Sequence, residues 1–218
     1  MPEEELGPLP AGRHGFSREQ VAHNQRERLL AGMATAVAEH GYAEVTIAHV
    51  TKAAKVSRRV FYANFESKDE CFLAAFDAVV GHVRELVAEA VGAAPDWPHQ
   101  AVAAAREALS FLASEPDLAR LCLVEAQSAG PAIAARFHAA VAELVPPLQR
   151  GRGERAAARE LPATTEDSTV GALVSLASRK VAAGEAAALE DFLPDFAQFI
   201  LAPYLGPEQA ERLSRAAA

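Results

Sequence analysis

The sequence predicts an all-α protein: an N-terminal three-helix bundle followed by a larger C-terminal helical domain. Half of the 218 residues are hydrophobic, but alanine dominates them and runs of β-branched residues are scarce, which favours helices over strands. Apolar residues recur at spacings of three and four, for example over residues 47–54 and 170–200, as in helices with one buried face. Proline and glycine separate these segments and indicate where helices end.

The first helix is predicted to begin after residue 16. Ser17 and Gln20 have the spacing of a capping box, and Phe16 and Val21 have that of a hydrophobic staple. We expect this helix to run to about His40, because the next residue is a glycine that can end it. Residues 1–15, which are rich in proline and glycine, are expected to form a disordered or loosely attached arm.

The remaining helix ends follow from caps and prolines. Ser67 with Glu70 forms a second capping box, Thr164 or Thr165 is expected to cap a later helix, and Pro146-Pro147 is expected to end or kink one. The charged segment 151–162 is expected to be an exposed connector. The predicted helices are 47–54, 57–63, 67–91, 98–113, 116–128, 131–149, 164–183 and 186–203, with a short final helix from Pro207.

Residues 46–68 carry the most informative pattern. Ile47, Val50 and Ala54 share one face of a short helix, and the small apolar side chain of Val56 can fill the angle at the turn. Thr46 and Ser57 can cap the two helices, and Phe61 and Phe65, four residues apart, can pack inward together. The pattern predicts a helix-turn-helix, which lays its second helix in the major groove of DNA.

An ordinary helical hairpin with a solvated basic face is the alternative for this segment. Lys55 weakens the helix-turn-helix interpretation, because glycine reaches the left-handed backbone of such a turn more easily. The charge distribution, in contrast, supports the helix-turn-helix interpretation. The whole chain has 21 basic and 29 acidic residues, but residues 13–68 have nine basic and five acidic, which leaves 12 against 24 elsewhere. A basic segment on an acidic chain indicates a localised DNA contact.

The run Val56-Ser57-Arg58-Arg59-Val60-Phe61-Tyr62-Ala63-Asn64-Phe65, followed by Ser67-Lys68-Asp69-Glu70, resembles the signature of TetR-family transcriptional regulators. Gly41-Tyr42 before Thr46 resembles the exit from that family's first helix. The resemblance covers about residues 17–80. The chain departs from the family pattern at Lys55, Val60 and Asn64, and the last two lie on the second helix, so they bear on the operator sequence.

The resemblance implies that the partner is a double-stranded DNA operator. Thr46, Tyr62 and Lys68 are expected to contact phosphates, which position a protein on the duplex. Arg58, Arg59 and Asn64 are expected to reach into the groove, where arginine pairs with guanine and asparagine with adenine. The full set of predicted DNA-binding residues is Thr46, Lys55, Ser57, Arg58, Arg59, Tyr62, Asn64 and Lys68.

Two wide apolar stripes occur in the last long helices. They exceed what one core face needs, although packing against the protein's own core accounts for about half of them. In the resembled family the corresponding helices form a four-helix bundle with their mates, and specific DNA recognition usually uses two half-sites. We therefore expect a homodimer, with an interface that includes Val170, Leu173, Val174, Leu189, Phe192, Phe196 and Phe199.

An apolar or aromatic small molecule is the expected effector, because the alanine-rich helices carry few large residues and can leave a cavity. Polar residues within apolar helices are the candidates for orienting it, although each can also be an ordinary core or surface group. The candidate effector-binding residues are Phe76, Phe111, Cys122, Glu125, Phe137, His138 and Arg179. The domains are then the arm, residues 1–15; the helix-turn-helix domain, 16–66; and the effector-binding and dimerisation domain, 67–218.

The sequence gives little support for a catalytic site, a bound cofactor or a membrane-spanning segment. The sequence contains no HExxH, GxSxG, GxGxxG or P-loop motif. His82, His138 and Cys122 could converge on a metal, but no short ligand pair occurs. No apolar run spans a membrane and no signal peptide begins the sequence, so a cytoplasmic protein with reduced, buried thiols at Cys71 and Cys122 is expected.

The sequence therefore predicts a ligand-responsive DNA-binding regulator that acts as a repressor and is not an enzyme. The alternative is a helical small-molecule-binding or interaction protein of the same fold that does not recognise an operator. The effector, the operator and the regulated genes cannot be deduced from these residues.

Overall fold

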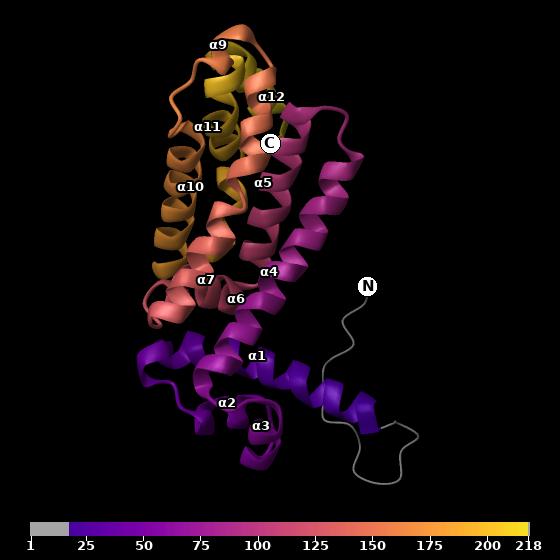
Figure 1. Ribbon diagram of the computed structural model, residues 1–218, viewed down its shortest axis with the longest axis vertical. Coiled ribbons are helices and arrows are strands. Elements are labelled where there is room, and N and C mark those ends of the chain that lie inside the picture. The colour runs from indigo at the N-terminus through magenta and orange to yellow at the C-terminus, as the bar shows by residue number, and fades with distance from the viewer. Residues whose placement is uncertain (1–17, 218) are drawn as a thin grey trace. The chain divides into compact units, whose positions relative to one another are not determined.

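The computed structural model describes residues 18–217, and all regular secondary structure in this range is helical (Figure 1). The all-α prediction is confirmed. The chain divides into two compact units, one ending at Asp77 and the other beginning at Ala78. This boundary lies within helix α4 (Lys68–Ala93), beyond the expected boundary at residues 66 and 67. The predicted arm and the proposed cap and staple at Phe16 and Ser17 lie outside the described residues.

The first unit contains α1 (Arg18–Glu44), α2 (Ile47–Ala53), α3 (Arg58–Asn64) and the beginning of α4. The predicted break at Gly41 is confirmed, because this residue has a non-helical backbone with φ 72° inside α1. Glycine adopts that conformation without the steric penalty that other residues have. Fully buried side chains form the core of the unit: Leu29, Met33, Val37, Val50, Phe61, Phe65 and Phe72.

The second unit contains the rest of α4 and eight further helices. They are α5 (Trp97–Ser114), α6 (Pro116–Leu123), α7 (Pro131–Ala142), α8 (Val145–Gln149), α9 (Ala156–Arg159), α10 (Thr165–Ala182), α11 (Leu193–Leu205) and α12 (Pro207–Ala217), with short 3-10 turns at Glu125–Gln127 (η1), Arg150–Gly153 (η2), Ala186–Ala188 (η3) and Glu190–Phe192 (η4). Proline occupies one of the first two positions of α5, α6, α7, α8 and α11. Its missing N–H has no helical partner there in any case.

Three predicted helices are shorter than expected, and proline accounts for two of the three differences. The helix predicted over 131–149 ends at Ala142, since neither Pro146 nor Pro147 has the N–H that would continue it. The helix predicted over 186–203 begins only at Leu193. Pro194 lacks the N–H that would bond to the carbonyl of residue 190, and its ring would clash with that carbonyl.

The third shortened helix and two caps also differ from prediction. The helix predicted over 116–128 ends at Leu123, whose carbonyl accepts from the side-chain amide of Gln127. Thr164 occupies the cap position of α10, but its side chain makes no capping hydrogen bond. The hydroxyl of Thr165 donates instead to the carbonyl of Pro162 at 2.8 Å. These threonines are therefore not side-chain caps.

The capping box at the start of α4 is only half formed. Ser67 Oγ accepts from the N–H of Glu70 at 3.1 Å, as predicted. The Glu70 carboxylate accepts from the N–H of Glu66 at 2.6 Å, one residue earlier than in a standard box. The first turn of α4 is therefore satisfied, but by a slightly different arrangement.

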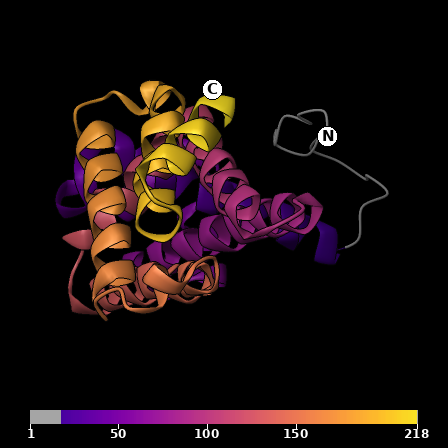
Figure 2. The same cartoon turned by 90° about the horizontal axis from the view of Figure 1, so that it is seen from above.

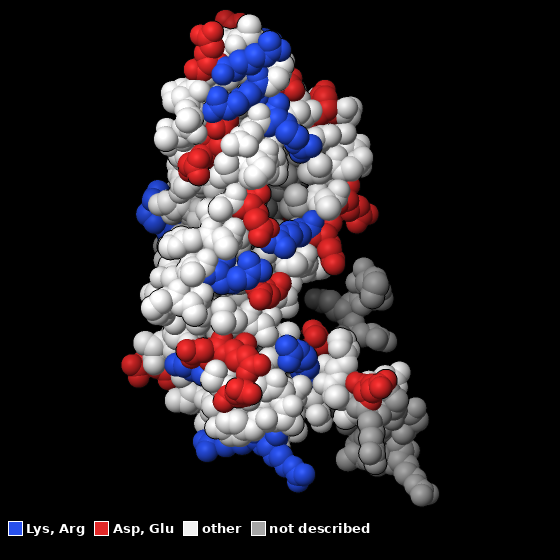
Figure 3. All heavy atoms as spheres, in the orientation of Figure 1, with Lys and Arg blue, Asp and Glu red and all other residues white. Residues whose placement is uncertain are grey.

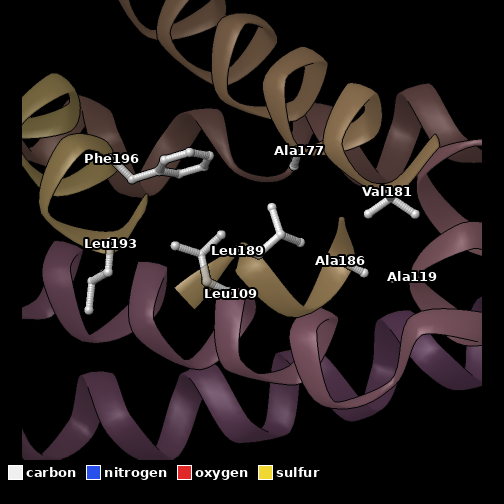
Figure 4. Close-up of a cluster of buried hydrophobic side chains, with 8 residues drawn as sticks. All are labelled: Leu109, Ala119, Ala177, Val181, Ala186, Leu189, Leu193 and Phe196. Atoms are coloured by element: carbon white, nitrogen blue, oxygen red, sulfur yellow. The ribbon is translucent and has the colours of Figure 1, made fainter. Parts of the chain in front are cut away.

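Two hydrophobic clusters hold the second unit together. α11 and α12 lie beside α5 when the molecule is seen from above (Figure 2). In the first cluster, side chains from α10, α11 and the segment between them meet those of α5 and α6 (Figure 4): Leu109, Ala119, Ala177, Val181, Ala186, Leu189, Leu193 and Phe196. The second cluster joins α5, α9, α11 and α12: Trp97, Ala158, Ile200, Leu201, Tyr204, Leu205 and Ala210.

A buried charge lies beside the second cluster. Glu166, only 1% exposed, accepts from Arg152 Nε at 2.8 Å and Nη2 at 2.7 Å, and from the hydroxyl of Tyr204 at 3.0 Å. Arg152 also donates to the carbonyls of Leu161 and Pro162, both at 2.8 Å. The arginine therefore joins the segment predicted as an exposed connector to α10, and Glu166 links both to α11 through Tyr204.

This ion pair makes stability depend on pH. The Arg152 guanidinium lowers the pKa of the Glu166 carboxyl below its ordinary value of 4.5. The folded state therefore binds that proton less readily than the unfolded state. The stabilisation is complete above pH 4.5 and is lost as the pH falls through the lowered pKa.

We predict that Glu166→Gln lowers the free energy of unfolding near neutral pH by about 2–3 kcal/mol, because it leaves Arg152 poorly paired. Urea denaturation at several values between about pH 3 and 7 should show less acid-dependent loss in this variant than in the unaltered protein. Glu160→Gln, which changes an exposed carboxylate of the same segment, serves as the control. Identical acid dependence in Glu166→Gln and the unaltered protein would contradict the role of this pair.

Candidate nucleic-acid interface

Side-chain caps define the beginnings of α2 and α3. Thr46 Oγ1 accepts from the N–H of His49 at 3.3 Å, and His49 Nδ1 accepts from the N–H of Thr46 at 3.4 Å. This reciprocal pair is a capping box in which histidine replaces the usual glutamate or glutamine. Ser57 Oγ accepts from the N–H of Val60 at 3.3 Å. Both predicted caps are confirmed, and they fix where the two helices of the motif start.

The turn between α2 and α3 has an unusual backbone. Lys55 has φ 52°, the only positive value at a non-glycine residue in the described part of the chain. The left-handed conformation expected at this position is therefore present, and a lysine adopts it. Val56, next in the turn, is half-buried, as a residue that fills the angle should be.

Residues of α1 hold this turn and the far end of α3. The buried guanidinium of Arg28 donates from Nη2 to the carbonyls of Ala54 and Lys55, both at 2.6 Å. The guanidinium of Arg26 lies over the ring of Phe65, with Cζ 4.5 Å from the ring centroid. α1 therefore supports both the beginning and the end of the second helix.

Gly32 lets α1 approach the same turn closely. A Cβ at this position would lie 2.7 Å from the backbone nitrogen of Ala54, closer than any carbon and nitrogen can pack. Arg26, Arg28 and Gly32 were not among the residues predicted from the sequence. The available signal was the glycine within an alanine-rich helix, which indicates a close backbone approach.

α3 presents a sharply divided surface. Phe61 and Phe65 are 0% and 2% exposed, with ring centroids 5.9 Å apart, so they anchor the helix as predicted. Tyr62 is 59% exposed, and Arg58 and Arg59 are also exposed. The three predicted contacts with the clearest access to a partner therefore lie on one short helix.

Asn64 and Lys68 are engaged with their own chain. The amide of Asn64 donates to the carbonyl of Val60 at 2.9 Å. Lys68 Nζ donates to the carbonyls of Tyr42 at 2.9 Å and Val45 at 3.2 Å, and lies 4.3 Å from the centroid of the Tyr42 ring. A contact of Asn64 with a base would require its amide to leave Val60, whereas an ammonium with three donors can add a phosphate.

The charged side chains of α2, α3 and the turn between them are all basic. Residues 45–65 contain Lys52, Lys55, Arg58 and Arg59 and no Asp or Glu. In the space-filling view, the basic atoms at the end of the unit that carries α3 stand apart from the acidic ones (Figure 3). Such a surface suits the phosphate backbone of a nucleic acid.

The predicted dimer residues divide between core and surface. Val170, Leu189 and Phe196 are buried within the unit, Leu173, Val174 and Phe192 are half-buried, and Phe199 is 50% exposed. The exposed Phe199 borders a surface hollow on the outer side of α10 and α11, lined by Thr169, Asp195, Gln198, Phe199, Ala202 and Pro203.

The seven candidate effector residues lie in different environments. Phe111, Cys122, Glu125 and Phe137 are buried in the second unit, and Phe76 belongs to the first unit. His138 and Arg179 are exposed, and Arg179 donates to Ser175 Oγ at 2.8 Å. The hollow on α10 and α11, and another between α5 and the start of α11, are lined by none of the seven.

Metal-ligating side chains and the two thiols complete the description of the chemically reactive groups. Residues 18–217 contain no group of three or more His, Cys, Asp or Glu side chains that could hold a metal ion. Burial raises the pKa of both thiols, Cys71 and Cys122, to about 12, so neither is a thiolate near neutral pH. None of the helices formed by these residues has the length and apolar character to cross a membrane.

The geometry defines a helical protein with a helix-turn-helix in its first unit. Residues 29–75 match the family described as bacterial regulatory proteins, tetR family. The matched residues lie within the first unit, and the match agrees with the resemblance seen in the sequence. No curated protein sequence matches it.

Solved structures share the fold of the chain. The fatty acid degradation regulator FadR from Bacillus halodurans has a TM-score of 0.72 at 19% identity, covering 80% of this chain and 97% of that one. FadR from Bacillus subtilis in complex with stearoyl-CoA has a TM-score of 0.66 at 16% identity, covering 83% and 98%. A TetR-like transcriptional regulator from Rhodococcus sp. RHA1 has a TM-score of 0.62 at 18% identity, covering 82% and 93%. The chain thus has the fold of TetR-family transcriptional regulators.

Proposed function

We propose that this protein is a sequence-specific transcriptional regulator that binds an inverted-repeat operator as a homodimer and acts as a ligand-responsive repressor. The observation that carries the proposal is α3. Its aromatic residues Phe61 and Phe65 are buried, while Arg58, Arg59 and Tyr62 are exposed on a basic surface. This is the arrangement that a helix needs in order to enter a major groove.

The residue types suggest separate roles within this surface. Arg58 and Arg59, near the beginning of α3, can each bond to guanine through two donors. Thr46, Ser57, Tyr62 and Lys68 suit single phosphate oxygens, which set position without reading sequence. Asn64 can read adenine once its amide leaves the Val60 carbonyl.

A binding protein of the same fold that recognises no operator is the alternative. The exposed tyrosine and arginines of α3 favour the regulator, because a protein that binds no nucleic acid gains nothing from a surface that concentrates positive charge on one short helix. Selection of bound fragments from a pool of random duplexes distinguishes the two functions. The regulator enriches one palindromic sequence, whereas the alternative enriches none.

We predict that Arg58→Ala changes which base pair is preferred at one position of each half-site, at about 1–3 kcal/mol. Tyr62→Phe should weaken binding to all sequences alike, because it removes a phosphate contact. Fluorescence anisotropy with the selected operator and its single-base variants measures both effects. Arg159→Ala, which removes an exposed arginine from the second unit, should leave affinity unchanged. A shift of base preference in Tyr62→Phe but not in Arg58→Ala would show that α3 turns Tyr62, and not Arg58, toward the bases, contrary to the proposal.

The outer side of α10 and α11 is the proposed dimer interface. Exposed Ser168, Gly171, Ala172 and Ser175 follow one side of α10, and such small side chains let two helices approach closely. Phe199 projects from α11 beside an apolar hollow. A large exposed aromatic next to a hollow is typical of a surface that another protein covers.

Two substitutions on the same helix separate the interface from the core. Phe199→Asp should give a folded monomer, because it places a charge on the proposed interface and leaves the core intact. Phe196→Asp should destabilise the fold itself by at least about 3 kcal/mol, because Phe196 is 6% exposed. Sedimentation equilibrium and circular dichroism check the pair. A Phe199→Asp dimer as tight as the unaltered one would remove this face from the proposal.

An apolar or aromatic effector is proposed to act on the second unit. The alanine-rich composition supports it, as does the similarity in fold to a FadR that was solved with stearoyl-CoA. A ligand that releases operator must favour a conformation that binds DNA less well. A protein that reads operators in this way would work in the cytoplasm.

We predict that a ligand of this class raises the melting temperature and lowers operator affinity. By linkage, bound operator should lower the affinity for the ligand by the same factor. Stearoyl-CoA, a long-chain fatty acid and an aromatic acid form the first panel, with coenzyme A alone as the control. Differential scanning fluorimetry and anisotropy measure the two effects. Ligands that stabilise the protein without changing operator affinity would contradict the proposed control of DNA binding.

A further inference from the structure

We propose that Lys55 keeps a strained left-handed backbone because its ammonium binds an operator phosphate, and that Arg28 is the positioning residue that holds this conformation. The inference rests on the proposed function, since it names a further contact of the same DNA-facing surface. It assigns a cause to two features that packing alone does not explain: a lysine at positive φ, and an arginine buried below it.

The strain is specific to position 55. A φ of 52° places the side chain of an L-residue too close to its own carbonyl, and glycine avoids that contact. The other positive φ values among the described residues are at Gly41, Gly130, Gly184 and Gly206. Within the described residues, glycine therefore occupies every other position with a positive φ. Strained backbone is found preferentially where function requires it.

The buried Arg28 is placed to hold the turn. α2 ends at Ala53, so the carbonyls of Ala54 and Lys55 have no helical donor. The Arg28 guanidinium bonds to both at 2.6 Å. A positive charge at the C-terminal end of a helix is also favoured by the helix dipole. Arg28 thus stabilises the conformation in which residue 55 is left-handed.

The side chain of Lys55 is free to meet DNA. It is exposed, and no described residue forms a hydrogen bond or ion pair with its ammonium. It lies three residues before Arg58, the first residue of α3. When the beginning of α3 faces base edges, the turn before it faces the sugar-phosphate wall of the groove. A four-carbon side chain with a point charge is suited to a phosphate there.

A set of four variants separates charge from strain. Lys55→Gly and Lys55→Asn remove the charge and relieve the strain, because both residues tolerate the left-handed region. Lys55→Ala removes the charge and keeps the strain, and Lys55→Arg keeps both. The full-length protein is used throughout, with the operator found by duplex selection as the probe.

The salt dependence of operator binding reports the phosphate contact. In Lys55→Gly, Lys55→Asn and Lys55→Ala, the slope of log affinity against log salt should be shallower by about one for each half-site. Lys55→Arg should keep the original slope. An unchanged slope in the three uncharged variants would overturn the phosphate contact. If the unaltered protein binds no duplex, the proposed function fails and this inference fails with it, which is a different result.

Thermal melting reports the strain. Lys55→Gly should raise the melting temperature by about 2–4 °C relative to Lys55→Ala, for a protein of this size. Arg28→Met should lower it, and by less when Lys55→Gly is also present, because a glycine turn depends less on the guanidinium. Equal losses in the two backgrounds would overturn the positioning role of Arg28. Equal melting of Lys55→Gly and Lys55→Ala would overturn the strain.

Discussion

The two hydrogen bonds from Arg28 to the carbonyls of Ala54 and Lys55 fix the turn that positions α3 and its exposed basic side chains. α3 has only seven residues, too few to hold a helical conformation alone. It depends on its cap, on its two buried aromatic side chains and on the turn that precedes it. Because Arg28 belongs to α1, the orientation of the reading helix is determined by a helix that lies outside the motif itself.

An arginine also organises the second unit, in a different way. Arg152 pairs with the buried Glu166 and bonds to two carbonyls of its own segment, while Tyr204 completes the coordination of the carboxylate. A buried ion pair contributes little net stability compared with an apolar replacement. Here the ion pair and its hydrogen bonds favour one conformation of the segment, because that conformation satisfies all of these groups. Both units therefore use a guanidinium to fix irregular backbone that hydrophobic packing alone would leave undetermined.

Local signals were predictable from the sequence, and long-range ones were not. The caps at Thr46 and Ser57 and the inward faces of Phe61 and Phe65 depend on residues a few positions apart, so spacing revealed them. The late start of α11 at Leu193 could also have been predicted, from Pro194. By contrast, Arg28 acts on residues 26 and 27 positions away, and no local pattern indicates that contact. The effector candidates were chosen from composition, which specifies no long-range contact.

Gly32 bears on how a protein of this fold could change the DNA sequence that it binds without changing the packing of its helices. Glycine within a helix costs about 1 kcal/mol relative to alanine, yet here a single methyl group would press against the nitrogen of Ala54. A larger residue would push α2 outward and tilt α3 with it. If α3 reads an operator as proposed, that tilt would alter all of its base contacts at once, whereas an exchange at an exposed position of α3 would alter only one. The close approach at Gly32 restricts the residue at this position, whereas the exposed side chains of α3 can be exchanged without altering the packing of α1 and α2.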